Sequence, residues 1–253
     1  MIDIETRGEV SILRMARGKG NSLNLQFMEA LTQSFDELSR GPTRAVVLTG
    51  ERSVFAAGVD LLAILEGGKA YLEAFMPALP AFFGHMVEFP KPLVAAVNGH
   101  AIAGGCVSTL ACDYRLMARG KGKIGLTELL VGVPFPTWAL EVVRFAVPRQ
   151  HLQEVIYTGR TYTADEALAR GLVDEVVELD ALLDRACEVA SQLGRIVPQT
   201  FRLTKRHLRM PLLERVKRYA PQFDPEVAKL WSNAEVLETM QAFVAEAIGR
   251  KTM

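Results

Sequence analysis

The sequence is poor in the features that mark disulfide-rich, zinc-binding and nucleic-acid-binding proteins. Its three cysteines, Cys106, Cys112 and Cys187, form no CxxC pair, so neither a disulfide framework nor a zinc site is indicated. Lys and Arg together number 29, as do Asp and Glu, so no excess of positive charge points to a nucleic-acid partner. This balance still allows a local basic pocket for a phosphorylated ligand.

Long apolar runs are also absent. No stretch approaches the ~20 consecutive apolar residues that a membrane-spanning helix needs, so we expect no membrane partner. The opening segment, MIDIETRGEVSILRM, lacks a basic stretch followed by an apolar run, so we expect no signal peptide and a cytoplasmic protein. With 253 residues, 49% of them hydrophobic, the chain suits one large domain, or a domain with an appendage.

Short apolar runs alternate with helical patterns over the first part of the chain. We expect strands at 10–15, 45–50, 93–97, 114–118 and 171–177. Helical spacing is found at 24–39, where Asn24 is the candidate N-cap, after residue 61, and at 104–112. Strands this apolar, alternating with helices, predict an α/β fold with a parallel sheet covered on both faces.

From about residue 137 the pattern becomes mainly helical. Thr163 and Glu166 have the spacing of a capping box at the start of one helix. The tail from Pro225 onward carries a broad apolar stripe, which needs a partner within the chain or on another subunit. Its members are Val227, Leu230, Trp231, Ala234, Leu237, Phe243, Ala247 and Ile248.

Two junctions place glycines where a buried strand ends: AVVLTG…FAAGVD and LVAAVNGHAIAGGC. Glycine lets the backbone bend sharply and lets a ligand approach closely. At the second junction the N–H groups of Gly104 and Gly105 would lie at a helix N-terminus, which favours an oxyanion. Such turns commonly serve only to reverse the chain. Nucleotide-binding fingerprints fail here, because NGHAIAGG does not fit GxGxxG, and Cys106 and Val107 replace the Lys and Ser or Thr of a P-loop.

The segments FAAGVDL and KPLVAAVNGHAIAGGC…CDYRL…IGLTELLVGVP, in this order and spacing, resemble the crotonase (enoyl-CoA hydratase/isomerase) superfamily. The resemblance implies a crotonase-like spiral of ββα units over residues 1–195, with the CoA-binding and active site. It implies a helical C-terminal oligomerisation region over 196–253, packing in trimers or dimers of trimers. The ligand would be an acyl-CoA thioester, with no metal and no cofactor beyond the coenzyme A of the substrate.

The resemblance also implies roles for individual residues. The N–H groups of Val59 and Gly104 would form an oxyanion hole, which stabilises the enolate that forms when a Cα proton leaves. Asp60 would support this loop, Phe83 would line the acyl pocket or fill the core, and Arg17 and Lys19 are candidates for the CoA phosphates. The residues implied in substrate or CoA binding are Ser22, Leu23, Ala57, Gly58, Asp60, Gly105, Val107, Phe135, Trp138 and Lys205.

The identity of the catalytic base decides between reactions. Hydratases of this superfamily use two glutamates, but here only the second is present, as Glu128, and Val107 stands at the first position. Valine cannot transfer a proton, whereas one base suffices to move a double bond by taking a C2 proton and returning it to C4. The surrounding sequence is similar to mitochondrial-type Δ3,Δ2-enoyl-CoA isomerases. We therefore expect an isomerase with Glu128 as the acid and base.

Other interpretations stay open at this point. A hydratase would need a carboxylate from elsewhere, such as Glu141, and an acyl-CoA hydrolase or decarboxylase is a further alternative. From a different class, the protein could be a non-catalytic acyl-CoA-binding protein or an RNA-binding relative. The balanced charge disfavours RNA, and the presence of Glu128 disfavours a binder without activity.

Overall fold

The fold is built on two sheets that share the first two-thirds of the chain. The computed structural model describes residues 1–249, with side chains described through Glu246. A six-stranded sheet has the order β1-β2-β3-β5-β7-β10, and a four-stranded sheet has the order β4-β6-β8-β9. Pairing is antiparallel between β1 and β2 and between β8 and β9, and parallel elsewhere in both sheets. The expected α/β fold with a largely parallel sheet is confirmed.

The strands of the larger sheet coincide with the apolar runs of the sequence. They are β1 (Ile2–Arg7), β2 (Val10–Met15), β3 (Ala45–Thr49), β5 (Leu93–Val97), β7 (Tyr114–Ala118) and β10 (Glu175–Val177). Every residue of β3 and β5 is buried, as expected for parallel strands covered on both faces. The short strands of the smaller sheet are β4 (Val54–Ala56), β6 (His100–Ile102), β8 (Ile124–Gly125) and β9 (Thr161–Tyr162).

The expectation that the sheet begins at Val10 is wrong, because β1 precedes it. Five of the six β1 residues are exposed, so this antiparallel edge strand lacks the apolar signal of a buried one. Gly8, at φ +62°, makes the tight turn between β1 and β2. The predicted strand at 171–177 is also shorter than expected, since only Glu175–Val177 pairs with β7.

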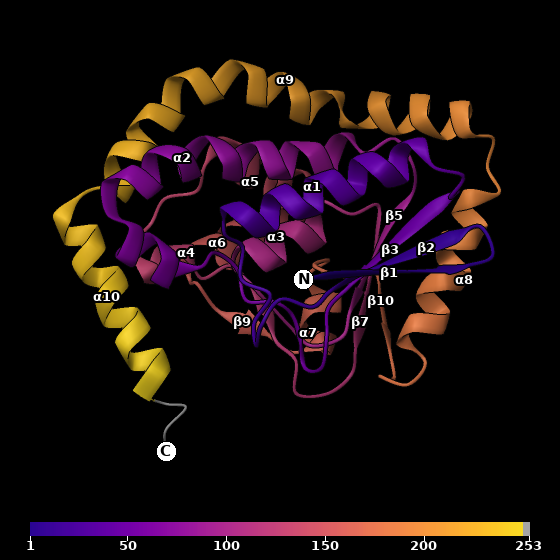
Figure 1. Cartoon of the computed structure of the whole chain (residues 1–253), viewed down its shortest axis with the longest axis horizontal. Coiled ribbons are helices and arrows are strands. Elements are labelled where there is room, and N and C mark those ends of the chain that lie inside the picture. The colour runs from indigo at the N-terminus through magenta and orange to yellow at the C-terminus, as the bar shows by residue number, and fades with distance from the viewer. Residues whose placement is uncertain (250–253) are drawn as a thin grey trace.

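Ten helices are described over residues 1–249, and they cover both faces of the larger sheet (Figure 1). The helices are α1 (Leu25–Arg40), α2 (Leu61–Glu88), α3 (Gly104–Leu110), α4 (Glu128–Val131), α5 (Thr137–Ala146), α6 (Arg149–Tyr157), α7 (Ala164–Ala169), α8 (Leu182–Gly194), α9 (Pro198–Trp231) and α10 (Ala234–Gly249). Asn24 caps α1 by accepting a hydrogen bond from the Phe27 N–H at 2.9 Å. The capping box of Thr163 and Glu166 at α7 is confirmed. None of these helices combines the length and the apolar character needed to cross a bilayer.

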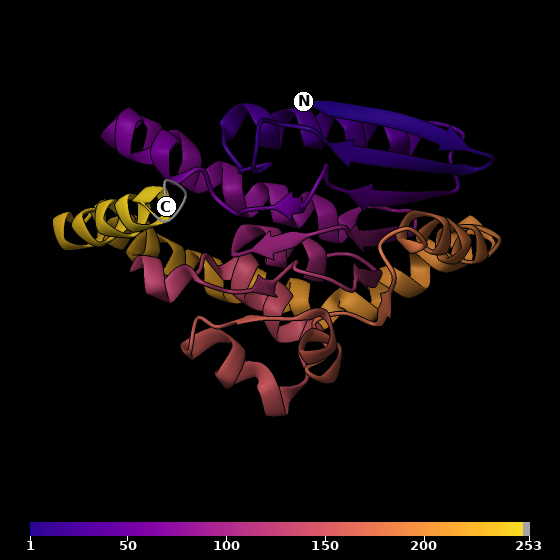
Figure 2. The same ribbon diagram turned by 90° about the horizontal axis from the view of Figure 1, so that it is seen from below.

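The two C-terminal helices enclose one side of the molecule. α9 continues through Pro211, Pro221 and Pro225, and it packs along α2 and α5, whereas α10 packs on α2 and α4 (Figure 1). In the perpendicular view of Figure 2, the β1–β2 hairpin and the α6–α7 pair lie at opposite edges, with the C-terminal helices between them. The apolar stripe of the tail is buried within the chain itself at Val227 and Trp231. The side chains of Ala247 and Ile248, expected on the same stripe, lie outside the described residues.

A buried ion cluster joins α9 to the larger sheet. The Asp113 carboxylate accepts hydrogen bonds from Lys205 Nζ and Arg209 Nη2, each at 2.7 Å, and from the Leu93 N–H at 2.9 Å. Arg209 also donates to the carbonyl of Val87 at the end of α2. Burial away from water lowers the pKa of Lys205 to about 8, although the neighbouring Asp113 carboxylate opposes this shift.

Candidate active site

The two glycine junctions lie against each other. The segment around Leu23 pairs with the first junction, since the Leu23 N–H donates to Gly58 O at 2.7 Å and the Asp60 N–H donates to Leu23 O at 2.9 Å. Gly58 has φ +84°, and a Cβ added there would lie 2.8 Å from Ile102 O and 3.2 Å from Gly104 N. Only glycine allows the first junction to approach the second this closely.

Two unpaired N–H groups border the place where the junctions meet. Leu23 forms its hydrogen bonds with the carbonyl of Gly58 and the N–H of Asp60. The N–H of Val59, which lies between them, therefore points away from Leu23. Gly104 is the first residue of α3, and the first N–H groups of a helix have no partner within it. Among the described residues, neither of these two N–H groups finds a hydrogen-bond acceptor. Val59 and Gly104 both line one cavity.

Ala103 makes the turn from β6 into α3 in an unusual conformation. Its φ of +50° and ψ of −120° lie in a region that favours glycine, so the backbone is strained there. Two hydrogen bonds hold it: the Ala103 N–H donates to Gly125 O at 2.8 Å, and the Val107 N–H donates to Ala103 O at 3.0 Å. The strain is located directly before the free N–H of Gly104, and strained residues of this kind cluster at functional sites.

Gly105 permits α3 to pack directly on β4. A Cβ added at Gly105 would lie only 2.1 Å from Ala56 O, a backbone atom that cannot move aside alone. We expect Gly105→Ala to lower the free energy of unfolding by about 1–3 kcal/mol, because the junctions must separate. Urea denaturation measures this change. Gly20→Ala is the matched control, since its Cβ would meet nothing closer than 3.3 Å, and equal losses in the two variants would contradict the explanation.

The cavity is mainly apolar and has a volume of about 80 Å³. Its wall is formed by Ala57, Val59, Leu61, Leu79, Phe83, Ile102, Ala103, Gly104, Thr127, Glu128, Val131, Val133, Phe135, Pro136, Ala139, Trp231 and Phe243. Glu128 is the one ionisable side chain among these lining residues. A single carboxyl group therefore faces an otherwise apolar space, bordered by two free N–H donors.

Glu128 begins the short helix α4 and lacks a charge partner. Its Oε2 is buried and has no hydrogen-bond partner among the described residues, although the residue as a whole keeps some exposure. Burial raises the pKa of Glu128 to about 8, because an anion loses its hydration in an apolar cavity; a hydrogen bond from its own backbone opposes this only in part. A carboxyl group titrating near neutrality is suited to both accept and return a proton.

The strand before Glu128 is held by close backbone packing. β8 pairs with β9, and a Cβ added at Gly125 would lie 2.3 Å from Arg160 O. On the other side of α4, a Cβ added at Gly159 would lie 2.4 Å from Leu130 Cγ. These contacts restrict the backbone before and after Glu128.

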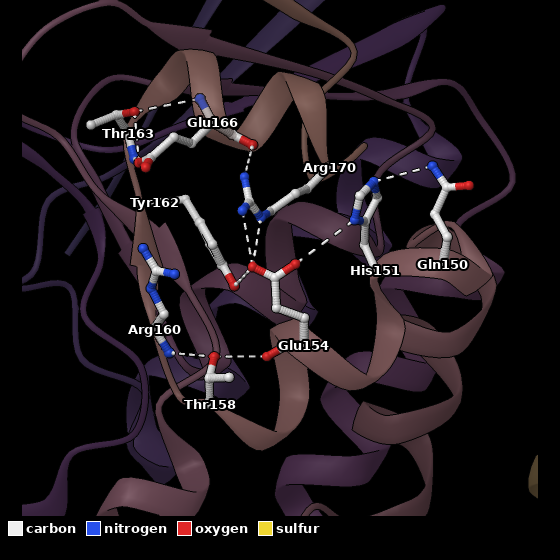
Figure 3. A network of polar contacts seen from close by, with 9 residues as sticks. All are labelled: Gln150, His151, Glu154, Thr158, Arg160, Tyr162, Thr163, Glu166 and Arg170. Carbon is white, nitrogen blue, oxygen red and sulfur yellow. Dashed lines mark hydrogen bonds and ion pairs between the residues drawn. The ribbon is translucent and has the colours of Figure 1, made fainter.

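A polar network connects β9 to α6 and to the residues around α7 (Figure 3). Glu154 of α6 accepts hydrogen bonds from Arg170 Nε at 3.1 Å and Nη2 at 2.9 Å, and from the Tyr162 hydroxyl at 3.4 Å. The Arg170 guanidinium also lies 4.5 Å from the centroid of the Tyr162 ring. Since Tyr162 is fully buried in β9, the network ties α6 and α7 to the strand that supports β8.

The structure brings most of the predicted site residues together. Six of them line the cavity: Ala57, Val59, Phe83, Gly104, Glu128 and Phe135. Five others lie beside it in the two junctions and the segment paired with them: Ser22, Leu23, Gly58, Asp60 and Gly105. Arg17 holds this segment by donating to Ser22 O at 2.8 Å and pairing with Asp60 Oδ2 at 3.2 Å. Its guanidinium is thereby engaged in joining the loops.

Three predicted residues lie elsewhere. Val107 is fully buried on α3 and packs in the core without lining the cavity, and Trp138 packs on α2, where a Cβ added at Gly84 would lie 2.9 Å from its ring. Lys205 donates to Asp113 and to Lys91 O, and its side chain is only 7% exposed, so its ammonium group is already paired within the protein. The tertiary packing decides where these three side chains lie, and a sequence motif alone does not reveal that packing.

Glu141 does not supply the missing second carboxylate. It lies on α5, is almost fully buried, and is paired with Arg215 Nε at 2.6 Å and Arg144 Nε at 3.4 Å. Its side chain is absent from the cavity wall. Among the wall residues that were not expected, Trp231 of α9 and Phe243 of α10 come from the C-terminal tail. The apolar stripe of the tail was the signal that could have found them, since it required a partner.

Known proteins are similar to this chain in both sequence and fold. The model of the enoyl-CoA hydratase/isomerase family matches residues 5–247. The mitochondrial enoyl-CoA delta isomerase 1 of Rattus norvegicus is 31% identical over 211 residues, which are 81% of this chain and 73% of that protein. The crystal structure of human mitochondrial delta3-delta2-enoyl-CoA isomerase has a TM-score of 0.94 at 26% identity, over 99% of each chain.

A structure of an enoyl-CoA hydratase from Mycobacterium marinum is also similar, with a TM-score of 0.81 and 26% identity over 89% of this chain and 99% of that one. Isomerases and hydratases thus share this fold. The parallel α/β fold and the matches to known proteins lead to the same family. The chain belongs to the enoyl-CoA hydratase/isomerase family, and it is an acyl-CoA enzyme with the crotonase fold.

Proposed function

We propose that this protein is a Δ3,Δ2-enoyl-CoA isomerase with Glu128 as its only acid and base. One observation carries the proposal: Glu128 is the single ionisable side chain among the described residues of the cavity wall. Adding water across a double bond needs one group for the water and one for the Cα proton. A double-bond shift needs only one group that serves both carbons.

In the proposed reaction the thioester oxygen is held by the N–H groups of Val59 and Gly104. The Glu128 carboxylate takes a proton from C2 of a 3-enoyl-CoA, and the negative charge spreads to the thioester oxygen as a dienolate. The two donors stabilise that charge without having to reorganise. Glu128 then returns the proton to C4, which leaves the double bond between C2 and C3. The reaction uses no metal and no cofactor beyond the coenzyme A of the substrate.

A comparison of two substrates tests the proposal. We expect 3-enoyl-CoA to be converted to 2-enoyl-CoA, with little addition of water to 2-enoyl-CoA, followed by mass spectrometry of the products. Deuterium placed at C2 of the 3-enoyl-CoA should appear in part at C4, because Oε2 of Glu128 is buried. Rapid hydration of 2-enoyl-CoA without isomerisation would instead identify a hydratase and would refute the single-base mechanism.

The pH dependence of kcat/KM reports the titration of the free enzyme. Because Glu128 must be anionic to accept the first proton and its pKa is about 8, kcat/KM should rise about tenfold per pH unit below that value and level off above it. Initial rates on 3-enoyl-CoA between pH 6 and pH 9.5 measure this profile. A plateau that already begins near pH 5 would show that Glu128 is not the limiting base.

A further inference from the structure

We infer that Trp231 closes the acyl end of the cavity and restricts the enzyme to short acyl groups. The inference rests on the proposed function in two respects: the acyl group of the ligand occupies this cavity, and the N–H groups of Val59 and Gly104 hold its thioester oxygen.

The direction of the acyl chain follows from the ends of the cavity. The free N–H donors of Val59 and Gly104 fix the thioester oxygen at the α3 side. Figure 1 shows α4 between α3 and α10, with the end of α9 beside α10. The acyl carbons must therefore leave the thioester, pass Glu128 on α4, and run towards Trp231 and Phe243.

Trp231 is a fixed wall at that far side. It is only 2% exposed, and its indole Nε1–H donates to Pro134 O at 3.0 Å, so the ring cannot rotate away without breaking this partly buried hydrogen bond. Behind it lies the fully buried Phe75, with ring centroids 6.1 Å apart. A longer acyl chain would thus meet two packed aromatic rings in succession.

The space in front of this wall is small. The cavity has a volume of about 80 Å³, and the thioester itself takes part of it. Each methylene that fits an apolar site strengthens binding, but one that meets a packed wall must displace it. The affinity for acyl-CoA should therefore stop rising with chain length at short chains.

Binding of saturated acyl-CoAs tests the inference without relying on turnover. Isothermal titration of the whole protein with hexanoyl-, decanoyl- and palmitoyl-CoA should give the tightest binding with hexanoyl-CoA. We expect palmitoyl-CoA to bind at least about tenfold more weakly, the discrimination that a packed apolar pocket provides. Equal or tighter binding of palmitoyl-CoA by the unaltered protein would overturn the inference.

Two wall variants locate the cause. Trp231→Leu opens the space in front of Phe75 and should move the decanoyl-to-hexanoyl affinity ratio at least about tenfold towards decanoyl-CoA. Phe243→Ala changes the neighbouring wall from a different helix, and it should move the ratio in the same direction even if Trp231→Leu folds poorly. Unchanged ratios in folded variants would refute the role of this wall.

The control is the other tryptophan of the chain. Trp138 packs on α2 outside the cavity, so Trp138→Leu should leave the chain-length profile unchanged although it removes the same ring. A shift in that variant equal to the shift of Trp231→Leu would mean general loosening of the fold. If no 3-enoyl-CoA is isomerised while the binding profile holds, the proposed reaction fails and the acyl wall stands.

Discussion

Glu128→Gln is expected to reduce kcat for the double-bond shift by about 10²–10⁴-fold, the usual contribution of a positioned acid and base. The amide keeps the shape of the carboxyl group but cannot accept the C2 proton. Since the variant still fits the same apolar wall, KM for the acyl-CoA should change little. Steady-state kinetics at pH 9, where the unaltered Glu128 is ionised, gives the comparison. Activity within a few-fold of the unaltered protein would refute the mechanism.

The same substitution should change stability in the opposite sense. The pKa of Glu128 is about 8 in the folded protein against 4.5 for an ordinary glutamate, so the folded state binds the proton more tightly than the unfolded state does. This contribution to stability is complete below about pH 4.5 and is lost as the pH rises through 8. Glutamine carries no such charge, so at pH 9 the variant should be more stable by a few kcal/mol.

Urea denaturation at pH 5 and pH 9 separates this effect from a general change in stability. The difference between Glu128→Gln and the unaltered protein should be small at pH 5 and large at pH 9. Glu29→Gln, at an exposed position of α1, is the matched control and should show no such dependence. If both glutamine variants behave alike, burial of the Glu128 carboxylate does not control the pH dependence.

Asp113→Asn should destabilise the fold by about 3–5 kcal/mol, because it leaves the charges of Lys205 and Arg209 buried without an anion. The side chains of both cations are only 7% exposed, and Asp113 is their shared partner. The loss should appear in the urea midpoint. Asp165→Asn is the matched control, since it removes an exposed partner of Arg119 at a similar distance of 2.6 Å.

The control should cost no more than about 1 kcal/mol, as exposed ion pairs contribute little. The contrast between the two aspartates is therefore the informative quantity. A loss at Asp113 as small as that at Asp165 would mean that water enters the cluster and hydrates both cations. The loss is also expected to loosen α9 from the sheet, because Lys205 and Arg209 are the α9 residues of the cluster.

The larger sheet could be predicted from sequence because its central strands are apolar throughout. β3 and β5 are buried at every position, so their composition alone marks them. β1 could not be recognised in this way, because an exposed edge strand owes its conformation to pairing with β2. α9 was equally hidden, since Pro211, Pro221 and Pro225 read locally as helix ends although the helix continues through them.

The residues of the candidate site likewise differ in whether the local sequence reveals them. The glycines of the two junctions and Glu128 carry local signals, because their chemistry requires those residue types at those positions. The motif did not reveal that Val107 is packed in the core, or that Lys205 is bound to Asp113, because both depend on neighbours far away in the sequence. Trp231 was recognisable only as a member of an apolar stripe that needed a partner.

The cavity wall is formed by two separate parts of the chain, one proposed to carry out the reaction and one proposed to contact the acyl group. Val59, Gly104 and Glu128 lie within residues 59–128, whereas Trp231 and Phe243 come from the last two helices, α9 and α10. Substitutions in α9 or α10 can reshape the acyl space while every group that handles a proton or the thioester oxygen stays in place. Substrate range and reaction chemistry are therefore free to diverge separately, through changes in different segments of one gene.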